Sequence, residues 1–310
     1  MSDAKIEFYT GPAGGWGALN SVKNALLRQD IPIKRAKTLL SANQPDGFDC
    51  PGCAWPEEPG GRKLAEFCEN GAKAVAEEAT KRTVTPEFFA RHSVAELAAK
   101  PEYWLSQQGR LTHPMVLESG DTHYRPVDWD RAYDLIAEHL QALASPDEAC
   151  FYTSGRTSNE AAFLYQLFVR SYGTNNLPDC SNMCHESSGS ALQETLGIGK
   201  GSVSLDDIYN ADLIFVVGQN PGTNHPRMMN ALRKAARQGC QIVTFNNLKE
   251  VALERFASPQ SPAELLTPAA TTISHQYLTP KLGGDMAAIR GMAKYILEEE
   301  GGRIDLAFIE

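Results

Sequence analysis

The chain has 310 residues, of which 42% are hydrophobic and 22% charged, the balance of a globular protein long enough for a sizeable core and two domains. Its 29 basic and 38 acidic residues leave a formal net charge of -9, which argues against a nucleic-acid-binding surface, because such surfaces cluster Lys and Arg. No run approaches the roughly 18 apolar residues that a membrane helix needs, so we expect no membrane partner. The first residues carry neither an apolar signal core nor a twin-arginine motif, so we expect a cytoplasmic location.

The first part of the chain is irregular, with Pro and Gly concentrated in residues 50–61. Helices are predicted over residues 19–27 and 63–78, and a third is predicted to begin at Thr85-Pro86-Glu87, where Thr is a good N-cap and Pro suits the first helical position. Cytosolic thiols stay reduced, so the seven cysteines are read for metal binding. We therefore expect residues 1–115 to form a small domain organised by a metal.

From about Pro126 the pattern changes to longer helices and strands. Six elements are predicted: a helix from Asp128 to about residue 144, a strand over 149–153, a helix over 157–172 ended by Gly173, a buried strand over 211–217, a helix over 225–238 and a strand over 241–245. The last three form a strand, a crossover helix and a strand, which predicts parallel pairing with a right-handed connection. Residues 116–310 are therefore predicted to form a mixed, largely parallel, doubly wound α/β domain, whose ligands sit beyond the carboxyl ends of the strands.

The first cluster of chemically informative residues is Cys50-Pro51-Gly52-Cys53, followed by Cys68. Two cysteines at this spacing can direct both thiolates at one metal or cluster, because the turn between them curls around it. A zinc site would need two further ligands, and His92 and His113 lack the short paired spacing of such sites. The residues alone therefore leave three possibilities for these cysteines: they bind an iron-sulfur cluster, they bind a zinc ion, or they are structural and bind no metal.

The second cluster of chemically informative residues is Cys184-His185, in a polar segment that we expect to be a turn-rich loop. A neighbouring imidazolium lowers the pKa of a thiol and can exchange a proton, which suits a reactive or metal-bound thiolate. The alternative is that Cys184 is a small buried hydrophobic residue.

The third cluster of chemically informative residues is the segment from Gly218 to Pro226, between the strand predicted over residues 211–217 and its crossover helix. Gly218 permits close approach of the backbone, and a helix start offers unpaired N-H groups to a phosphate. The segment is a candidate nucleotide or pyrophosphate site, although the G-x-G-x-x-G spacing is absent.

Together with two further segments, these motifs resemble, in order, the signatures of the molybdopterin oxidoreductase superfamily. The motifs are residues 153–160, residues 172–176, Cys184-His185, residues 218–221 and His225-Pro226. Residues 46–56 are similar to formate dehydrogenase-like alpha subunits, and the chain resembles the N-terminal portion of such a subunit.

The resemblance implies a role for each matching residue. Cys184 is implied to ligate molybdenum and His185 to be the neighbouring catalytic histidine, while Cys50, Cys53 and Cys68 are implied to ligate a 4Fe-4S cluster. The residues implied to hold a molybdopterin guanine dinucleotide or line its cavity are Gly155, Asn175, Asn176, Gly218, Asn220, Pro221, His225 and Asp285.

The sequence departs from the family pattern at two positions near the cysteines. Glu57 stands where a third cysteine is usual, so the cluster has three thiolates and an oxygen or water ligand, uses Glu57, or is labile. Asn70-Gly71 stands where the family usually has Lys-Gly. Family members are also much longer, and the chain stops without a capping signal, so we expect it to be a fragment with an incomplete α/β domain.

The function implied by the resemblance is a two-electron oxidoreductase that acts on formate or a similar small molecule. Its cofactors would be molybdenum or tungsten in a bis(molybdopterin guanine dinucleotide), and a cluster that passes electrons to a redox partner or other acceptor. The alternative is a non-catalytic structural or assembly module that binds zinc or a cluster.

Overall fold

The computed structural model describes residues 9–31, 33–53, 55–58, 60–153, 157–178, 180–299 and 304–309, without the side chains of 33–35, 180–184 and 308–309. It contains two compact units. Unit 1 consists of Met1–Asn24, Lys37–Lys73 and Val203–Glu310, and unit 2 of Ala25–Ala36 and Ala74–Ser202. The domain boundary predicted after residue 115 stays a prediction.

A three-stranded parallel sheet organises unit 1, with the strand order β10-β7-β6. Its strands are β6 (Leu213–Val217), β7 (Gln241–Phe245) and β10 (Gln276–Leu278). Helix α11 (Pro226–Arg237) connects β6 to β7, and Gly239, with φ 99°, allows the chain to turn back into β7. The predicted parallel strand, helix and strand are confirmed.

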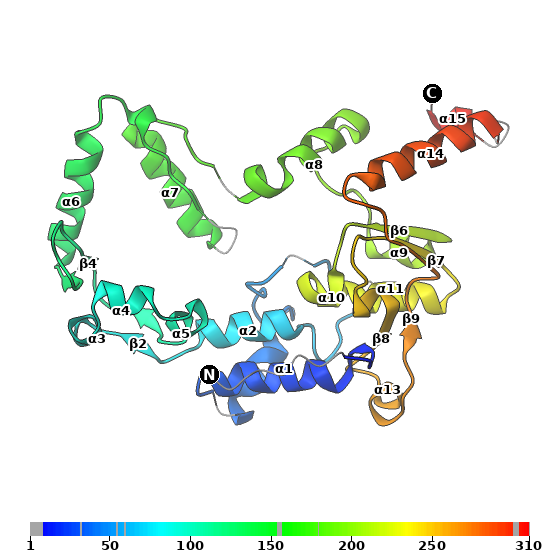
Figure 1. Cartoon of the computed structure of the whole chain (residues 1–310), viewed down its shortest axis with the longest axis horizontal. Helices are drawn as coiled ribbons and strands as arrows, with labels where there is room; N and C mark the ends of the chain where they lie inside the picture. Colours follow the sequence, from blue (N-terminus) through cyan, green and yellow to red (C-terminus); the bar gives the residue numbers. More distant parts are fainter. Residues whose placement is uncertain are drawn as a thin grey trace. The chain divides into compact units, whose positions relative to one another are not determined.

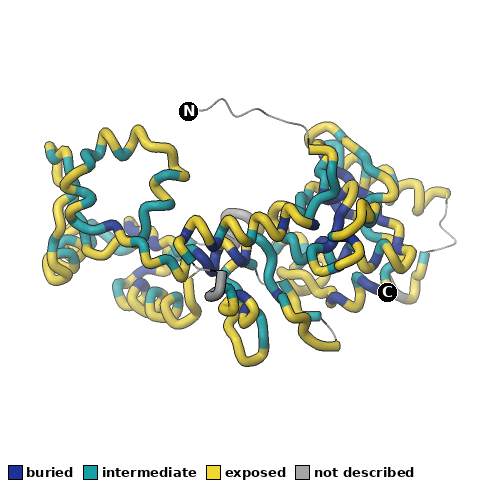
Figure 2. Tube along the Cα trace, turned by 90° about the horizontal axis from the view of Figure 1, so that it is seen from below, coloured by how far each residue is buried: buried dark blue, intermediate teal, exposed yellow. Residues whose placement is uncertain are grey.

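The main core of unit 1 forms where α11 packs against this sheet. Met229, Leu232 and Ala235 lie on one face of α11 and are buried together with Ile242 of β7. Figure 1 shows α9 (Leu205–Asn210) and α11 beside β6 and β7, and Figure 2 shows buried residues running through this part of the chain. An apolar stripe at helical spacing is what positions α11, since its opposite face is polar.

Only one face of β6 is buried, which corrects the prediction of a buried strand over residues 211–217. Leu213, Phe215 and Val217 are exposed, whereas Ile214 and Val216 face the core. Alternate strand residues point to opposite faces, and among the described residues the helices of unit 1 cover only the face of Ile214 and Val216.

The other elements of unit 1 are short, and three of them build a second small sheet, β1-β8-β9. Those that lie wholly in unit 1 are β1 (Ala13–Gly14), α10 (Pro221–Asn224), α12 (Val251–Glu254), β8 (Arg255–Ala257), α13 (Pro262–Leu266), β9 (Thr271–Thr272), α14 (Gly284–Glu299) and α15 (Leu306–Ile309). Three elements have residues in both units: α1 (Gly15–Arg28), η1 (Ile33–Ser41) and α2 (Glu69–Glu78).

Unit 2 is mainly helical, with two small two-stranded sheets. Its elements are β2 (Thr83–Val84), α3 (Pro86–Arg91), α4 (Val94–Ala98), α5 (Glu102–Ser106), β3 (Arg110–Leu111), β4 (Met115–Val116), β5 (Arg125–Pro126), α6 (Trp129–Gln141), η2 (Pro146–Glu148), α7 (Asn159–Tyr172) and α8 (Cys180–Leu196). Asp128 caps α6 by accepting from the Arg131 N-H, and Gly173 ends α7 at φ 113°, as predicted.

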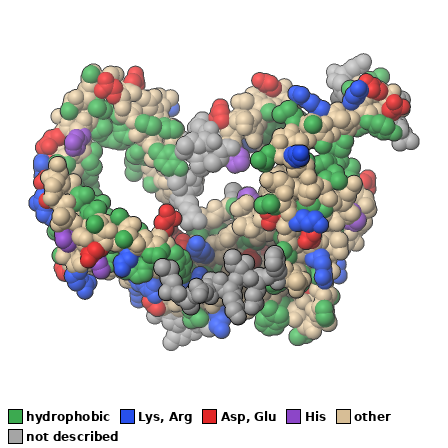
Figure 3. All heavy atoms as spheres, in the orientation of Figure 1, with side chains coloured by type: hydrophobic (Ala, Val, Ile, Leu, Met, Phe, Trp, Pro, Cys, Tyr) green, Lys and Arg blue, Asp and Glu red, His purple; other side chains and the backbone are tan. Residues whose placement is uncertain are grey.

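Large apolar side chains lie exposed on two helices of unit 2. Trp129, Tyr133 and Ile136 are exposed on α6, and α7 exposes Phe163, Leu164, Leu167 and Phe168. Figure 3 shows hydrophobic side chains at the surface of this segment. The buried residues of α7 and its surroundings are fewer, and centre on Val169 packed with Phe151 and Ala149.

Three predicted elements are wrong in part. The helix expected over 63–78 begins only at Glu69, because Lys63 and Glu66 are held by loop hydrogen bonds. Residues 149–153 form no strand of more than one residue, and a backbone hydrogen bond of this segment runs from the N-H of Phe151 to the carbonyl of Asn176. Cys184 and His185 were expected in a loop, but they lie in the first part of helix α8. The second half of α8 contains the good helix formers Ala191 to Glu194, and helix formation is cooperative, so the helix includes the polar residues before them.

The fold class is confirmed as mixed α/β, with parallel pairing in several small sheets. Unit 2 contributes one short parallel pair, β2 with β3, among the described strands. An iron-sulfur domain at the N-terminus stays a prediction.

Candidate functional site

The carboxyl ends of β6, β7 and β10 meet at one edge of the sheet, because all three strands are parallel. Gly218 follows β6 with φ 65°, a backbone conformation that favours glycine, and its N-H donates to the carbonyl of Phe245 at 2.8 Å. The N-H of Asn246 donates to the carbonyl of Leu278 at 3.0 Å. This carboxyl edge is where sheets of this kind bind ligands.

The turn after β6 is fixed by its own residues. The Oδ1 of Asn220 accepts from the N-H of Thr223 at 3.2 Å, which caps the short helix α10. Pro221 at the first position of α10 is buried. A Cβ at Gly222 would overlap the Cβ of Ala252, so only glycine fits between α10 and α12. The Nε2 of Gln219 lies 3.4 Å from Nδ1 of His225.

Asn246 is a residue of this edge that the sequence reasoning missed. Its side chain is buried, and Nδ2 donates to the carbonyl of Gln219 at 3.3 Å, which ties the end of β7 to the turn after β6. A signal was available, because Asn246 is the first polar residue after the predicted strand over residues 241–245.

Asp285 lies on the third segment that leaves this edge of the sheet. The chain passes from β10 to α14, and Asp285 is half-buried in the first turn of α14. A carboxylate there is stabilised by the positive end of the helix dipole. The predicted cofactor residues of unit 1 thus follow β6, where Gly218, Asn220, Pro221 and His225 lie, and β10, where Asp285 lies.

The three cysteines predicted to bind a cluster are free thiols and half-buried in unit 1. A Cβ added at Gly71 would stand 2.8 Å from the Sγ of Cys50 and 4.0 Å from the Sγ of Cys68. The N-H of Cys50 donates to Oδ1 of Asn43 at 2.9 Å. The sulfurs of Cys50 and Cys68 thus both lie near Gly71, and thiolates are the chemical type of ligand that holds iron-sulfur clusters.

Burial raises the pKa of the Cys68 thiol, and the charges of Glu69 and Cys53 add to this effect, against the hydrogen bond from the Gly71 N-H. Metal binding to this thiol therefore releases a proton. Within the residues that the structure describes, no three His, Cys, Asp or Glu side chains are grouped so that they could hold a single metal ion.

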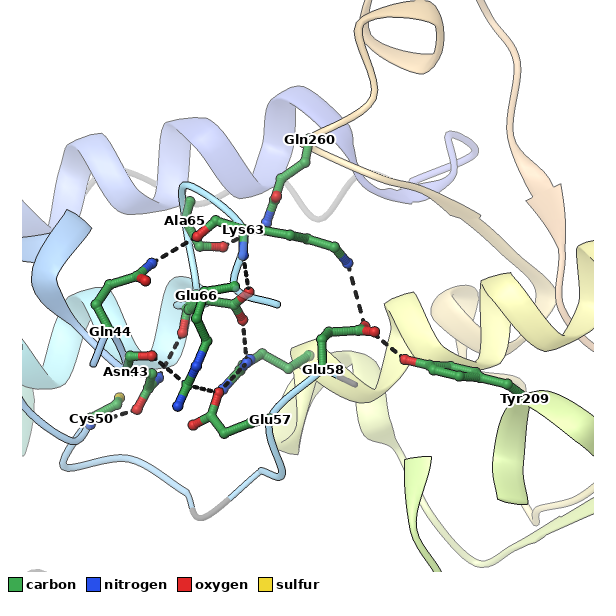
Figure 4. A network of polar contacts seen from close by, with 12 residues as sticks. Asn43, Gln44, Cys50, Glu57, Glu58, Lys63, Ala65, Glu66, Tyr209 and Gln260 are labelled. Carbon is green, nitrogen blue, oxygen red and sulfur yellow. Dashed lines mark hydrogen bonds and ion pairs between the residues drawn. The ribbon is translucent and has the colours of Figure 1, made fainter. Parts of the chain in front are cut away.

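A network of charges surrounds the loop that carries Cys50 and Cys53 (Figure 4). Arg227 of α11 pairs with Glu66, and these side chains are only 12% and 4% exposed. Arg62 pairs with Glu57 and donates to the carbonyl of Asn43 at 2.6 Å. Asn43, which has φ 56°, also donates to the carbonyl of Glu66 at 2.6 Å. Asn43 therefore connects the Cys50 loop to the Glu66 segment.

A second contact holds the same loop against α9. The Tyr209 hydroxyl donates to Oε1 of Glu58 at 2.7 Å, and Lys63 lies 3.4 Å from the same oxygen. Burial and the neighbouring Glu58 carboxylate raise the pKa of Tyr209, so this hydroxyl keeps its proton and donates at neutral pH.

The remaining predicted residues lie in unit 2. Cys184 and His185 are in α8, where His185 is exposed and the Cys184 side chain is outside the described part. Asn176 donates from Nδ2 to the carbonyls of Asp147 at 2.8 Å and Ala149 at 3.2 Å. Asn175 is exposed beside it. Gly155 lies outside the described residues.

Residues 110–300 match the family described as Molybdopterin oxidoreductase, which is more than half of the chain. The chain belongs to the molybdopterin oxidoreductase family. Members carry a molybdenum or tungsten pterin cofactor, and the carboxyl edge described above lies inside the matched residues.

Two of three relatives of this chain have names that refer to a redox function. An uncharacterized oxidoreductase of Mycobacterium tuberculosis is 64% identical over 92% of this chain and 37% of its own length. Protein YdeP of Escherichia coli is 47% identical over 96% of this chain and 39% of its own length. A Staphylococcus aureus protein named "Putative formate dehydrogenase" is 29% identical over 66% of this chain and 19% of its own length.

The chain spans less than two fifths of the length of these relatives. Among solved structures, acetylene hydratase from Pelobacter acetylenicus has a TM-score of 0.47 and 19% identity, over 61% of this chain and 24% of that one. None of the helices in the described ranges has the length and apolar character needed to cross a bilayer.

Proposed function

We propose that this chain is part of a molybdopterin-dependent oxidoreductase that removes two electrons from formate or a related small oxidised-carbon substrate. The observation that carries the proposal is the family match over residues 110–300, because that span contains Cys184, His185 and the turn after β6. The resemblance at residues 46–56 and the relative named for formate support formate as the first substrate to test.

The proposed dinucleotide site is the carboxyl edge of β6, β7 and β10. Gly218, Asn220, Pro221 and His225 would hold one molybdopterin guanine dinucleotide, with Asp285 near it. The support is topological, since parallel strands bring the turn after β6 and the segment after β10 to one edge, where Asn246 is bonded to the turn after β6.

The proposed catalytic residues are Cys184 and His185. Cys184 would bind molybdenum or tungsten through its thiolate, and His185 would accept or donate a proton beside it, the role that imidazole fills near neutral pH. When bound, the metal and its two pterins supply the two-electron chemistry. Gly155, Asn175 and Asn176 would line the same cavity.

The proposed electron relay is one 4Fe-4S cluster on Cys50, Cys53 and Cys68. It would pass electrons from the pterin site to a redox partner protein or another acceptor in the cytoplasm. The support is the gathering of Cys50 and Cys68 around Gly71 and the family position of all three cysteines.

Replacing the thiol of Cys184 tests this assignment. Cys184→Ala should abolish formate-dependent dye reduction while leaving the iron content and the circular dichroism spectrum unchanged. Cys150→Ala is the matched control, because Cys150 is an exposed thiol of the same unit with no proposed role. Turnover by Cys184→Ala comparable with that of the control would contradict the proposal.

A further inference from the structure

The outer face of the β10-β7-β6 sheet, the face opposite α11, is apolar and partly uncovered. Leu213, Phe215 and Val217 of β6 lie on it and are 50%, 46% and 39% exposed. Val243 and Phe245 of β7 lie beside them in register. Phe245 is buried, and the centre of its ring lies 6.0 Å from that of Phe215. The exposed residues therefore continue a surface that is already packed, and parallel sheets are usually covered on both faces.

Helix α14 of the same unit carries a complementary apolar stripe. The stripe consists of Met286, Ile289, Ala293 and Ile296, which recur every three or four residues and so lie on one side of the helix. Met286, Ile289 and Ile296 are exposed, and none of the residues of α14, all of which are described, is buried. Because helices in proteins gain most of their stability by packing an apolar side, this stripe needs a partner surface.

The connection between β10 and α14 suits docking of the helix on the outer face. Only residues 279–283 separate Leu278, at the end of β10, from Gly284 at the start of α14, an ordinary length for such a connection. Gly283 has φ 78°, which lets the chain turn sharply. Helix α11 covers the inner face on the way from β6 to β7. A right-handed connection that turns back from β10 toward β6 must therefore run over the outer face.

The stripe also matches the outer face in length. If α14 runs antiparallel to the strands, it begins at the carboxyl edge, where β10 ends. The stretch from Met286 to Ile296 measures about 15 Å along a helix, and the stretch from Val217 to Leu213 measures about 13 Å along a strand. Both ends of the stripe would thus meet an exposed residue of β6.

We propose that the outer face of the sheet is the docking surface of α14, which covers Leu213, Phe215 and Val217 in a closed arrangement of unit 1. The occupant is α14 and not a second copy of the chain, because the short connection gives α14 an effective concentration on the order of millimolar. Asp285, in the first turn of α14, then stays at the carboxyl edge. The docking requires only the chain itself, so it does not depend on the proposed function.

Photo-cross-linking from the position of Phe215 tests this docking directly. The full chain, at low concentration, carries p-benzoylphenylalanine in place of Phe215, and the peptides that become cross-linked on irradiation are identified by mass spectrometry. We expect cross-links to residues of α14 within the same chain. The control carries the same amino acid in place of Leu266, an exposed residue of α13 outside the sheet, and should give no cross-link to α14.

Two variants then place the same carboxylate on opposite sides of α14. Ile289→Asp puts it in the stripe, where docking would bury it without a partner, so the yield of the cross-link should fall by about tenfold or more. Gly291→Asp puts it on the other side of the helix, where a Cβ meets nothing within 4 Å, and the yield should not change. Circular dichroism spectra check that both variants are folded.

Several results would overturn the inference. Cross-links that join two copies of the chain, or that reach only segments other than α14, would show a different occupant, and the absence of any cross-link would show that the face stays open. Equal yields in folded Ile289→Asp and Gly291→Asp would show that the stripe is not what docks. The chain with an unaltered α14 decides the matter even if a variant fails to fold. None of these results depends on pterin or on Cys184, so the proposed function is tested separately.

Discussion

The side-chain amide of Asn70 donates to the carbonyl oxygen of Thr223 at 2.7 Å. Asn70 follows Cys68 at the start of α2, and Thr223 lies in α10 after β6. One hydrogen bond therefore joins the proposed cluster loop to the proposed dinucleotide turn, at the position where the family usually has a lysine.

Asn70→Ala should loosen α10 without unfolding the sheet. The lost hydrogen bond is exposed and contributes about 1 kcal/mol. Hydrogen exchange at the amides of Thr223 and Asn224 should therefore become several-fold faster, while exchange in β6 stays unchanged. Asn210→Ala removes a comparable exposed bond to the carbonyl of Asp206 and should not affect α10. Equal exchange in both variants would show that the bond to Thr223 is not formed.

Arg227→Ala should be far more damaging than the removal of an exposed arginine. It leaves the carboxylate of Glu66, which is 4% exposed, without its cation, and such a change costs about 3–5 kcal/mol. Arg125→Ala breaks exposed pairs with Glu118 and Asp121 and should cost at most about 1 kcal/mol. The measurement is urea unfolding of both variants, and similar midpoints would show that the Glu66 pair is not buried in solution.

Glu264 should make the protein acid-sensitive. Burial alone would raise the pKa of Glu264, but hydrogen bonds from Arg233 and the Ser258 N-H, together with the charges of Arg233 and Arg237, outweigh it and lower the pKa. A folded-state pKa below the unfolded one gives stability that is present above the unfolded value and is lost as the pH falls through the folded value.

Glu264→Gln should therefore reduce the free energy of unfolding at neutral pH by about 2 kcal/mol and flatten its decline toward acid. Urea unfolding at steps from pH 7 to about pH 3 measures this decline. Parallel curves for the wild type and Glu264→Gln would mean that the pKa of Glu264 is the same in the folded and unfolded states.

Gly222→Ala should destabilise the dinucleotide turn, because its Cβ would overlap Ala252 and overpacking costs about 1–3 kcal/mol. Gly291→Ala is the opposite case. A Cβ at Gly291, within α14, meets nothing within 4 Å, so this variant should gain about 0.5–1 kcal/mol. Thermal unfolding midpoints that shift in the same direction would contradict the close approach of α10 and α12.

Local signals in the sequence predicted much of the fold. Asp128 and Gly173 mark helix ends by their own chemistry, and the apolar runs over β6 and β7 with a helix between them predict parallel pairing. Prediction was wrong where local preference and tertiary context disagree. The polar residues after Cys180 indicate a turn but lie in α8. Residues 149–153 resemble a strand, but Phe151 packs against helix α7 and its backbone N-H bonds to the loop residue Asn176.

The site could be predicted only where it follows from local pattern. The turn after β6 was placed at the carboxyl end of its strand, and the structure puts it there. The pairing of Arg227 with Glu66 could not be predicted, because the two residues are 161 apart in the chain and no local pattern links them. The contacts of Asn43 and Asn70 could not be predicted for the same reason, since each side chain donates to a distant backbone carbonyl.

The carboxyl edge of β6, β7 and β10 is the centre of this account, and pterin content tests it most directly. The wild type, Asn246→Leu and the control Asn210→Ala would each be purified anaerobically from molybdate-supplied cells. Each protein would then be oxidised, and the fluorescent pterin that it releases would be measured together with its molybdenum and tungsten content. The account predicts pterin and metal in the wild type and the control, and a large loss of both in Asn246→Leu, which removes the bond between β7 and the turn after β6. A folded wild-type chain without pterin, or full pterin content in a folded Asn246→Leu variant, would contradict it.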